Sequence, residues 1–267
     1  MSKVDLNAKT VSVSVSGAGG SGAVTVGLIL LKSMANAGFY GYMSRFSGPQ
    51  IRGGESAVIL NFSNLPVESP AHYSDLHFAL DWHGFERFSD EIPLSSQSTV
   101  IFDNSHDPLP RVVEDTGAKI IELDLKEQVH QLKGSRANAF AMGMLAFKIG
   151  LPLENVLDAL HHLLDKKGEE VFQLTSEAVR IGYGLLEEKG SFIEGWEPAS
   201  QTRWNISGNE ACGLGALRGG IKYAAAYPIT PASDIVEYLA PRLDKVGGNV
   251  MIAEDELAAI NMAIGGS

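Results

Sequence analysis

The first predicted element is a strand in which apolar and polar residues alternate. Val11, Val13 and Val15 are separated by serines, and this period of two is typical of β-strands. After a glycine-rich turn, residues 23–37 carry apolar side chains at helical spacing and stop before Gly38, a residue type that commonly ends helices. The pattern therefore predicts a strand–turn–helix unit near the start of the chain.

Further apolar runs are short and are bounded by polar turns, as expected of buried strands in a parallel sheet. They cover residues 56–62, 76–80, 99–102 and 119–123. Beyond them the apolar spacing becomes helical, which predicts helices at residues 137–149, 154–164 and 171–186. Strands that alternate with helical segments indicate an α/β fold with a largely parallel sheet, and we expect the later helices to cover that sheet.

Residues 190–209 are rich in Gly, Pro, Ser and Asn and show no periodicity, so they are predicted to connect two domains. A second α/β pattern follows, with helices at 211–221, 234–241 and 256–264 and strands at 223–227 and 249–253. So few strands cannot bury a sheet face alone. We therefore expect that this second domain is truncated or that a partner completes it. The predicted domains are residues 1–190 and 209–267, joined by a linker at 191–208.

The composition and net charge of the chain disfavour several classes of protein. The 267 residues are 45% hydrophobic and 20% charged, which is ordinary for a globular protein. The formal net charge of −11 disfavours a nucleic-acid surface, which needs clustered Lys and Arg. The single cysteine, Cys212, cannot form an internal disulfide or hold an iron–sulfur cluster. Since no apolar run is long enough for a membrane span or a secretory signal, we expect a cytoplasmic protein.

Residues 17–22 match the pattern G-x-G-x-x-G between a predicted strand and a predicted helix, where free N–H groups favour a phosphate or carboxylate. Three standard sites are not supported. A dinucleotide site needs an acidic residue about 20 positions on, but none lies between Gly22 and Glu55. A P-loop needs Lys and then Ser or Thr where Ala23 and Val24 stand. A nucleophile elbow, G-x-S-x-G, lacks its last glycine here.

Arg45 and Arg52 lie in residues 44–54, which are predicted to form a loop between the first helix and the next strand. Two guanidinium groups near a glycine-rich helix start suit a polyanionic ligand. The alternative is that the glycines serve tight packing and that the arginines pair with surface carboxylates. No metal site is predicted, because His77 and His83 fall in a strand and the helix start that follows it.

The glycine loop, together with Gly-Pro-Gln-x-Arg-Gly-Gly at residues 48–54, resembles the γ-type domain of the 2-oxoacid:ferredoxin oxidoreductases. Asn138, Gly143, and the Gly182-Tyr183 pair follow in the order of that family. The motif Tyr-Pro-Ile-Thr-Pro at residues 227–231 resembles the start of the family's α-type domain. The resemblance implies a γ-type domain with a largely parallel sheet and covering helices, followed by the N-terminal part of a thiamine-pyrimidine-binding α/β domain.

This resemblance implies oxidative decarboxylation of a 2-oxoacid, 2-oxoglutarate by overall similarity, with thiamine diphosphate and coenzyme A. Glu256 is similar in position to the carboxylate that favours the imino tautomer of the thiamine aminopyrimidine. Glu254 is the second choice, and a carboxylate favoured only by the helix dipole is the other interpretation. The substrate would contact Thr230, in a stiff loop with Tyr227, Pro228, Ile229 and Pro231. The candidates to face the coenzyme A phosphates are Gly17, Gly19, Gly20, Gly22, Arg45 and Arg52.

The resemblance also implies partners. The sequence holds neither a Gly-Asp-Gly run for a magnesium–diphosphate site nor the cysteines for a cluster. A β-type subunit would therefore carry Mg²⁺ and a [4Fe-4S] cluster, in an (αβ)2 assembly that reduces ferredoxin. Two other interpretations stay open: a pyruvate- or indolepyruvate-type member of the same superfamily, and a non-catalytic module that binds coenzyme A or a nucleotide.

Overall fold

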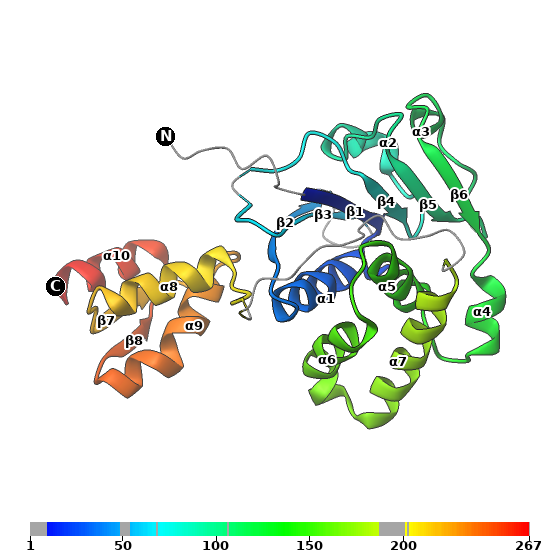
Figure 1. Ribbon diagram of the computed structural model, residues 1–267. Helices are drawn as coiled ribbons and strands as arrows, with labels where there is room; N and C mark the ends of the chain where they lie inside the picture. The colour runs from blue at the N-terminus through cyan, green and yellow to red at the C-terminus, as the bar shows by residue number, and fades with distance from the viewer. Residues whose placement is uncertain are drawn as a thin grey trace. The chain divides into compact units, whose positions relative to one another are not determined.

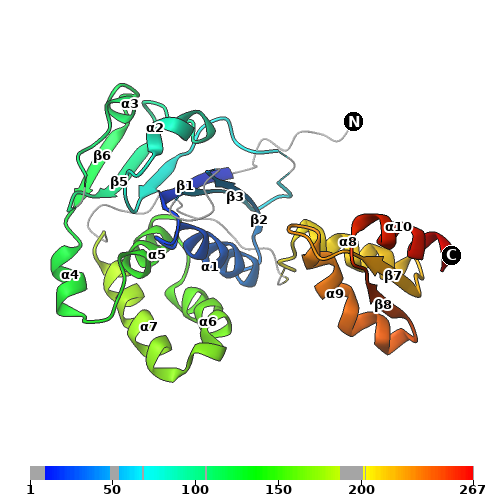
Figure 2. The same cartoon turned by 180° about the vertical axis from the view of Figure 1, so that it is seen from behind.

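The computed structural model describes residues 10–48, 54–67, 69–105, 107–186, 201 and 203–266. The chain forms two compact units that divide after Arg203, and each unit has its own sheet (Figures 1 and 2). No helix within the described residues is long and apolar enough to cross a membrane.

A six-stranded sheet with the order β2-β3-β1-β4-β5-β6 forms the centre of the first unit. Its strands are β1 (Thr10–Ala18), β2 (Tyr40–Ser47), β3 (Glu55–Ser63), β4 (Leu76–Ala79), β5 (Thr99–Asp103) and β6 (Lys119–Leu123). The strands β1, β4, β5 and β6 run parallel to one another, whereas β3 is antiparallel to both β1 and β2. The predicted α/β fold with a largely parallel sheet is confirmed.

The sequence pattern misses strand β2. Residues 44–54 are predicted to form a loop, but Arg45 lies within β2 and pairs with Val58 of β3. The prediction is wrong because β2 is an edge strand: Gly41 and Tyr42 are exposed, so the strand lacks the buried apolar run that marks its neighbours. Arg52, the second arginine of the predicted loop, lies outside the described residues.

Helices and turns cover both faces of this sheet. They are α1 (Ala23–Asn36), α2 (Phe85–Phe88), α3 (Arg111–Glu114), α4 (Lys126–Gln131), α5 (Ala137–Lys148), α6 (Leu153–Leu164) and α7 (Glu169–Gly184). The helices α1, α5, α6 and α7 lie on one face, and α2 and α3 lie on the other (Figure 1). The long predicted helices therefore do cover the sheet, on one side.

Two glycines let α5 and α7 pack backbone against backbone. A Cβ added at Gly143 would overlap the carbonyl oxygen of Val179, and one at Gly182 would overlap the carbonyl oxygen of Phe140. Because any side chain here would force the helices apart, the pair fixes the position of α5 and of its N-terminus. This N-terminus lies at the candidate site.

On the opposite face of the sheet the serines of β1 surround a buried histidine. Ser14 Oγ lies 2.8 Å from Nδ1 of His77, and Ser16 Oγ lies 3.2 Å from its Nε2. The ring is packed against Trp82 and Phe85 and has no exposed surface. Burial lowers the pKa of His77 from 6.5 to about 3, so this histidine is neutral at physiological pH.

The second unit is small. Its strands β7 (Tyr223–Ala226) and β8 (Asn249–Ile252) pair in parallel, and its helices are α8 (Gly208–Arg218), α9 (Ser233–Leu243) and α10 (Glu256–Gly265). Helix α8 begins with a capping box in which the Ser207 side chain and the Glu210 backbone N–H are bonded, and the Glu210 carboxylate bonds the Ser207 N–H in return. Helix α9 packs on α8 and on β8, and its residues Leu239 and Leu243 are buried.

Candidate functional site

The glycine loop joins the carboxyl end of β1 to the start of α1. Gly20 and Gly22 have φ angles of +95° and +98°, which L side chains rarely adopt. Gly22 is the N-cap of α1 and has no side-chain cap, so the first N–H groups of the helix have no partner in the described part of the chain. A Cβ added at Gly20 would meet nothing within 4 Å. The loop thus offers a helix N-terminus that a ligand can approach.

The other glycines shape this loop. A Cβ on Gly17 would lie 2.6 Å from Ser21 Oγ, so the loop folds back closely over this glycine. The Gly19 N–H donates a hydrogen bond to the carbonyl of Gly54, which ties the loop to the start of β3. Gly20 and the helix start therefore remain as the parts of the loop that face open space.

A pocket of about 370 Å³ lies beside this loop at the carboxyl ends of β1 and β4. Its lining comprises Ala18, Ser21, Leu80, Asp81, His83, Asp107 and Ala137. From β1 the chain passes through α1 to β2 and β3 on one side of the sheet, whereas β4 and β5 lie on the other side. The pocket therefore lies between β1 and β4, where the chain connections lead away to opposite sides of the sheet. In open α/β sheets this is the usual place for a ligand.

Asn138 lies against the glycine loop, a position that the sequence alone does not indicate. It lies in the first turn of α5, and its side-chain amide fills the space that the missing Cβ of Gly22 leaves open. Helix α5 begins without a side-chain cap beside the same pocket. Two uncapped helix N-termini and one amide therefore meet at the glycine loop. The only signal in the sequence was the position of Asn138 in the family order.

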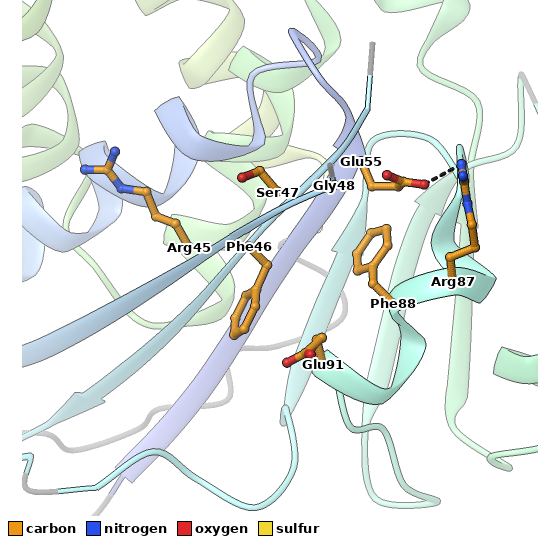
Figure 3. A pocket seen from close by; sticks show the side chains of 8 residues that line it. All are labelled: Arg45, Phe46, Ser47, Gly48, Glu55, Arg87, Phe88 and Glu91. Atoms are coloured by element: carbon orange, nitrogen blue, oxygen red, sulfur yellow. Dashed lines mark ion pairs between the residues drawn. The ribbon is translucent and has the colours of Figure 1, made fainter. Parts of the chain in front are cut away.

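Arg45 faces the same side of the sheet as α1. Its partner in the strand register, Val58, lies on that side, since a Cβ on Gly27 of α1 would be 2.8 Å from Val58 Cγ2. Arg45 is exposed and also borders a second pocket of about 620 Å³ at the end of β2. Figure 3 shows that its guanidinium points away from Glu55 and Arg87, which line the pocket from the opposite face.

In the second unit, the residues predicted to bind substrate and thiamine meet at one edge of the sheet. Ala226 of β7 pairs with Ile252 of β8, and the Ala253 N–H donates to the Ala226 carbonyl oxygen at 2.9 Å. Residues 227–231 follow β7 directly, and Glu256 begins α10 just after β8. Thr230 and Glu256 are both exposed. Parallel pairing thus places the two segments at the same carboxyl edge.

The acidic residues before α10 differ in what they contact. Asp255 is the N-cap of the helix, and its Oδ1 accepts a hydrogen bond from the Ala258 N–H at 2.7 Å. Glu256 is the first helical residue, and the capping role is already filled by Asp255. Its carboxylate is therefore available to another molecule. The neighbouring Ile229 and Leu257 are also exposed, by 50% and 74%, so apolar surface surrounds this edge.

The two histidines near β4, His77 and His83, lie in different surroundings. His77 is enclosed by two serines and aromatic rings, and His83 is exposed. Throughout the ranges that the structure describes, no group of three or more His, Cys, Asp or Glu side chains is arranged to hold a metal ion.

Comparison with known proteins identifies both units. Residues 12–185 match the pyruvate ferredoxin/flavodoxin oxidoreductase family, and residues 214–267 match the thiamine diphosphate-binding part of such enzymes. The α subunit of a 2-oxoacid:ferredoxin oxidoreductase from Sulfolobus is 25% identical over 94% of this chain and 47% of its own length. The 2-oxoglutarate synthase subunit KorA of Methanocaldococcus jannaschii is 45% identical over 62 residues, which cover 23% of this chain and 17% of that subunit.

Comparison with solved structures gives the same family of enzymes. The 2-oxoglutarate:ferredoxin oxidoreductase from Magnetococcus marinus, solved with 2-oxoglutarate, coenzyme A and succinyl-CoA bound, matches with a TM-score of 0.83. It is 27% identical and covers 97% of this chain and 46% of its own. The γ subunit of a keto/oxoacid ferredoxin oxidoreductase from Geobacter sulfurreducens shares the fold of 66% of this chain, with a TM-score of 0.51 and 21% identity over 95% of that subunit.

The chain spans about half the length of these relatives, 47% of the Sulfolobus subunit and 46% of the Magnetococcus chain. The family match covers residues 12–185, more than half of the 267 residues, and the thiamine-binding match follows it in the same chain. This is the order of a γ-type domain fused ahead of an α-type domain. The chain therefore belongs to the pyruvate ferredoxin/flavodoxin oxidoreductase family, and it is similar to α subunits of 2-oxoacid:ferredoxin oxidoreductases.

Proposed function

We propose that this chain is the γ–α part of an enzyme that oxidatively decarboxylates 2-oxoglutarate. The products are succinyl-CoA and carbon dioxide, and the released electrons pass to ferredoxin. The observation that carries the proposal is the meeting of residues 227–231 and Glu256 at one edge of the β7–β8 sheet. The ligands in the Magnetococcus marinus enzyme and the KorA relative support 2-oxoglutarate as the acid.

Thiamine diphosphate fits the chemistry of this edge. Glu256 offers an exposed carboxylate that the helix cap does not use, and Thr230 offers a hydroxyl at the same edge. When bound, thiamine diphosphate supplies the carbanion that decarboxylation needs. Glu256 would hold a proton between its carboxylate and the ring nitrogen of the aminopyrimidine, which favours the imino tautomer. Thr230 would donate a hydrogen bond to the substrate, from a loop that Pro228 and Pro231 stiffen.

Coenzyme A is proposed to bind at the glycine loop. The uncapped start of α1 and the open approach to Gly20 suit a phosphate, while Gly17, Gly19 and Gly22 give the loop its shape. Arg45 and Arg52 would supply positive charge, and the Asn138 amide would donate a hydrogen bond. The acidic pocket with Asp81 and Asp107 would instead face donor groups such as ribose hydroxyls.

We further propose domains at residues 1–190 and 209–267 with a linker between them. The family matches and the division after Arg203 support this arrangement. A β-type partner subunit would supply Mg²⁺, the diphosphate site and a [4Fe-4S] cluster, in an (αβ)2 assembly. The exposed free thiol of Cys212 supports a reducing, cytoplasmic compartment.

An activity assay with alternative substrates tests the proposal. The natural full-length polypeptide is co-expressed with its β-type subunit and assayed with coenzyme A and a viologen dye. We expect kcat/KM for 2-oxoglutarate to exceed that for pyruvate or indolepyruvate by at least about tenfold. A preference for another acid would reassign the substrate within the superfamily. Coenzyme A binding without dye reduction for any acid would instead support a non-catalytic binding module.

A further inference from the structure

Glu55 is a buried carboxylate at the first position of β3. Its side chain is 5% exposed and forms an ion pair with Arg87 of α2. Two glycines make room for it, because a Cβ added at Gly48 or Gly84 would overlap the Glu55 side chain. A buried carboxylate is costly unless it is paired. The structure thus provides both a cradle and a charged partner for this one side chain.

The backbone around Glu55 joins three segments of the candidate coenzyme A site. Glu55 pairs with Ala18, the last residue of β1, in the β1–β3 register. Its carbonyl oxygen accepts a hydrogen bond from the Gly48 N–H at 2.8 Å, and the carbonyl of the preceding Gly54 accepts one from the Gly19 N–H. The carboxyl ends of β1 and β2 therefore meet the start of β3 at this residue, next to the glycine loop.

The side-chain contacts of Glu55 reach the connection between β4 and α2. Gly84, one of the cradle residues, is the N-cap of α2, and Arg87 lies one turn later. The same connection holds Asp81, which accepts a hydrogen bond from the Ala18 N–H. Figure 3 shows Glu55 and Arg87 facing each other across the end of the sheet. The glycine loop is thus attached to this connection at two places, through Asp81 and through Glu55.

We propose that Glu55 is a positioning residue that holds the glycine loop in its binding shape through the ion pair with Arg87. This inference rests on the proposed binding of coenzyme A at that loop. Glu55 does not contact the ligand in this account. It fixes the Gly19–Gly54 hydrogen bond and the end of β1, so the N–H groups at the start of α1 keep a constant direction.

The test uses Glu55→Gln, Arg87→Gln and the double variant in the full-length polypeptide with its β-type partner. Coenzyme A itself is the probe, and its Kd is measured by calorimetry. Hydrogen exchange of the Gly19 and Gly48 amides gives a readout that does not depend on the ligand. The matched control is Asp115→Asn, which removes a carboxylate from the exposed ion pair with Arg111.

We expect each single variant to raise the coenzyme A Kd by about tenfold, and the double variant to do no worse, because the two residues act as one unit. Exchange at Gly19 and Gly48 should accelerate, while kcat at saturating coenzyme A and the Asp115→Asn control stay unchanged. Arg87 is 61% exposed, so Arg87→Gln decides the question should Glu55→Gln fail to fold.

Separate results overturn the inference and the proposed function. Unchanged Kd and unchanged exchange in a folded Arg87→Gln variant would refute the positioning role while coenzyme A binding stands. If the melting temperature falls but neither the coenzyme A Kd nor the hydrogen exchange of Gly19 changes, the ion pair only stabilises the fold and has no positioning role. If the unsubstituted assembly does not bind coenzyme A, the proposed function of the loop fails first.

Discussion

The carboxylate of Asp81 accepts a hydrogen bond from the backbone N–H of Ala18 at 2.8 Å. This contact ties the carboxyl end of β4 to the last residue of β1, immediately before the glycine loop. The same oxygen also accepts the N–H of His83 at 3.0 Å. The loop is therefore held by an acidic residue that faces the pocket, and the local structure depends on that charge.

Replacing Asp81 with Ala should lower both stability and ligand affinity. The Ala18 N–H would lose its acceptor in a partly buried site, which costs about 1–3 kcal/mol of unfolding free energy. A looser loop should also raise KM for coenzyme A. Chemical denaturation and steady-state kinetics measure the two effects. Asp107→Ala is the control, because Asp107 lines the same pocket but is exposed, and it should leave stability unchanged.

Asn138 should contribute to coenzyme A binding. Its amide lies against Gly22, so Asn138→Ala removes a donor at the helix N-terminus and should raise KM for coenzyme A about tenfold, the equivalent of one hydrogen bond. The KM for the 2-oxoacid should not change. Asn36→Ala, at the other end of α1, is the control. An unchanged KM for coenzyme A in Asn138→Ala would remove this residue from the site.

The contact between α5 and α7 predicts a sharp difference between neighbouring glycines. Gly182→Ala should destabilise the fold by about 3 kcal/mol, since its Cβ would overlap the carbonyl oxygen of Phe140. Gly184 lies two residues later in the same helix, and a Cβ added there would meet nothing within 4 Å. Gly184→Ala should therefore leave the unfolding free energy unchanged or raise it by about 0.5 kcal/mol. Thermal melting of the two variants measures the difference. Equal effects would mean that the helices are not in backbone contact.

The buried His77 predicts a loss of stability in acid. Its folded pKa of about 3 lies below the ordinary value of 6.5, so below pH 6.5 the unfolded chain binds a proton that the folded chain does not. Stability should fall as pH decreases from about 6.5 to 3, by about 2 kcal/mol at pH 5 from this group. The measurement is urea denaturation at several pH values. His77→Gln should flatten the slope, whereas His130→Gln, an exposed histidine, should not.

Local patterns were enough to predict most of the first unit. The strands β1, β3, β4 and β5 are largely buried, and the edge strand β6 still carries the apolar residues Ile120, Ile121 and Leu123. The helices α1, α5, α6 and α7 have apolar residues at helical spacing. Strand β2 was missed because it lies at the edge, where Gly41 and Tyr42 remain exposed and no apolar run forms. The register between β2 and β3 could not be predicted from the sequence either, because the pairing of Arg45 with Val58 depends on the whole sheet.

Within the candidate site, too, some features could be predicted from local sequence and others could not. The Tyr-Pro-Ile-Thr-Pro motif and Glu256 are local signals, and the parallel pairing of β7 and β8 brings them to one edge. Contacts between residues that are distant in the sequence leave no local pattern from which they could be predicted. The Asp81–Ala18 bond and the Glu55–Arg87 pair join segments that only the fold brings together. The polar contacts that support the site are therefore its least predictable part.

The role of Glu256 is the central claim, and one comparison tests it most directly. Glu256→Gln and Glu254→Gln are assayed in the assembly with the β-type subunit, with 2-oxoglutarate, coenzyme A and a viologen dye. We predict that Glu256→Gln slows dye reduction by about a thousandfold while the subunits still co-elute, and that Glu254→Gln stays active. Normal activity in Glu256→Gln, or its loss only in Glu254→Gln, would contradict the account.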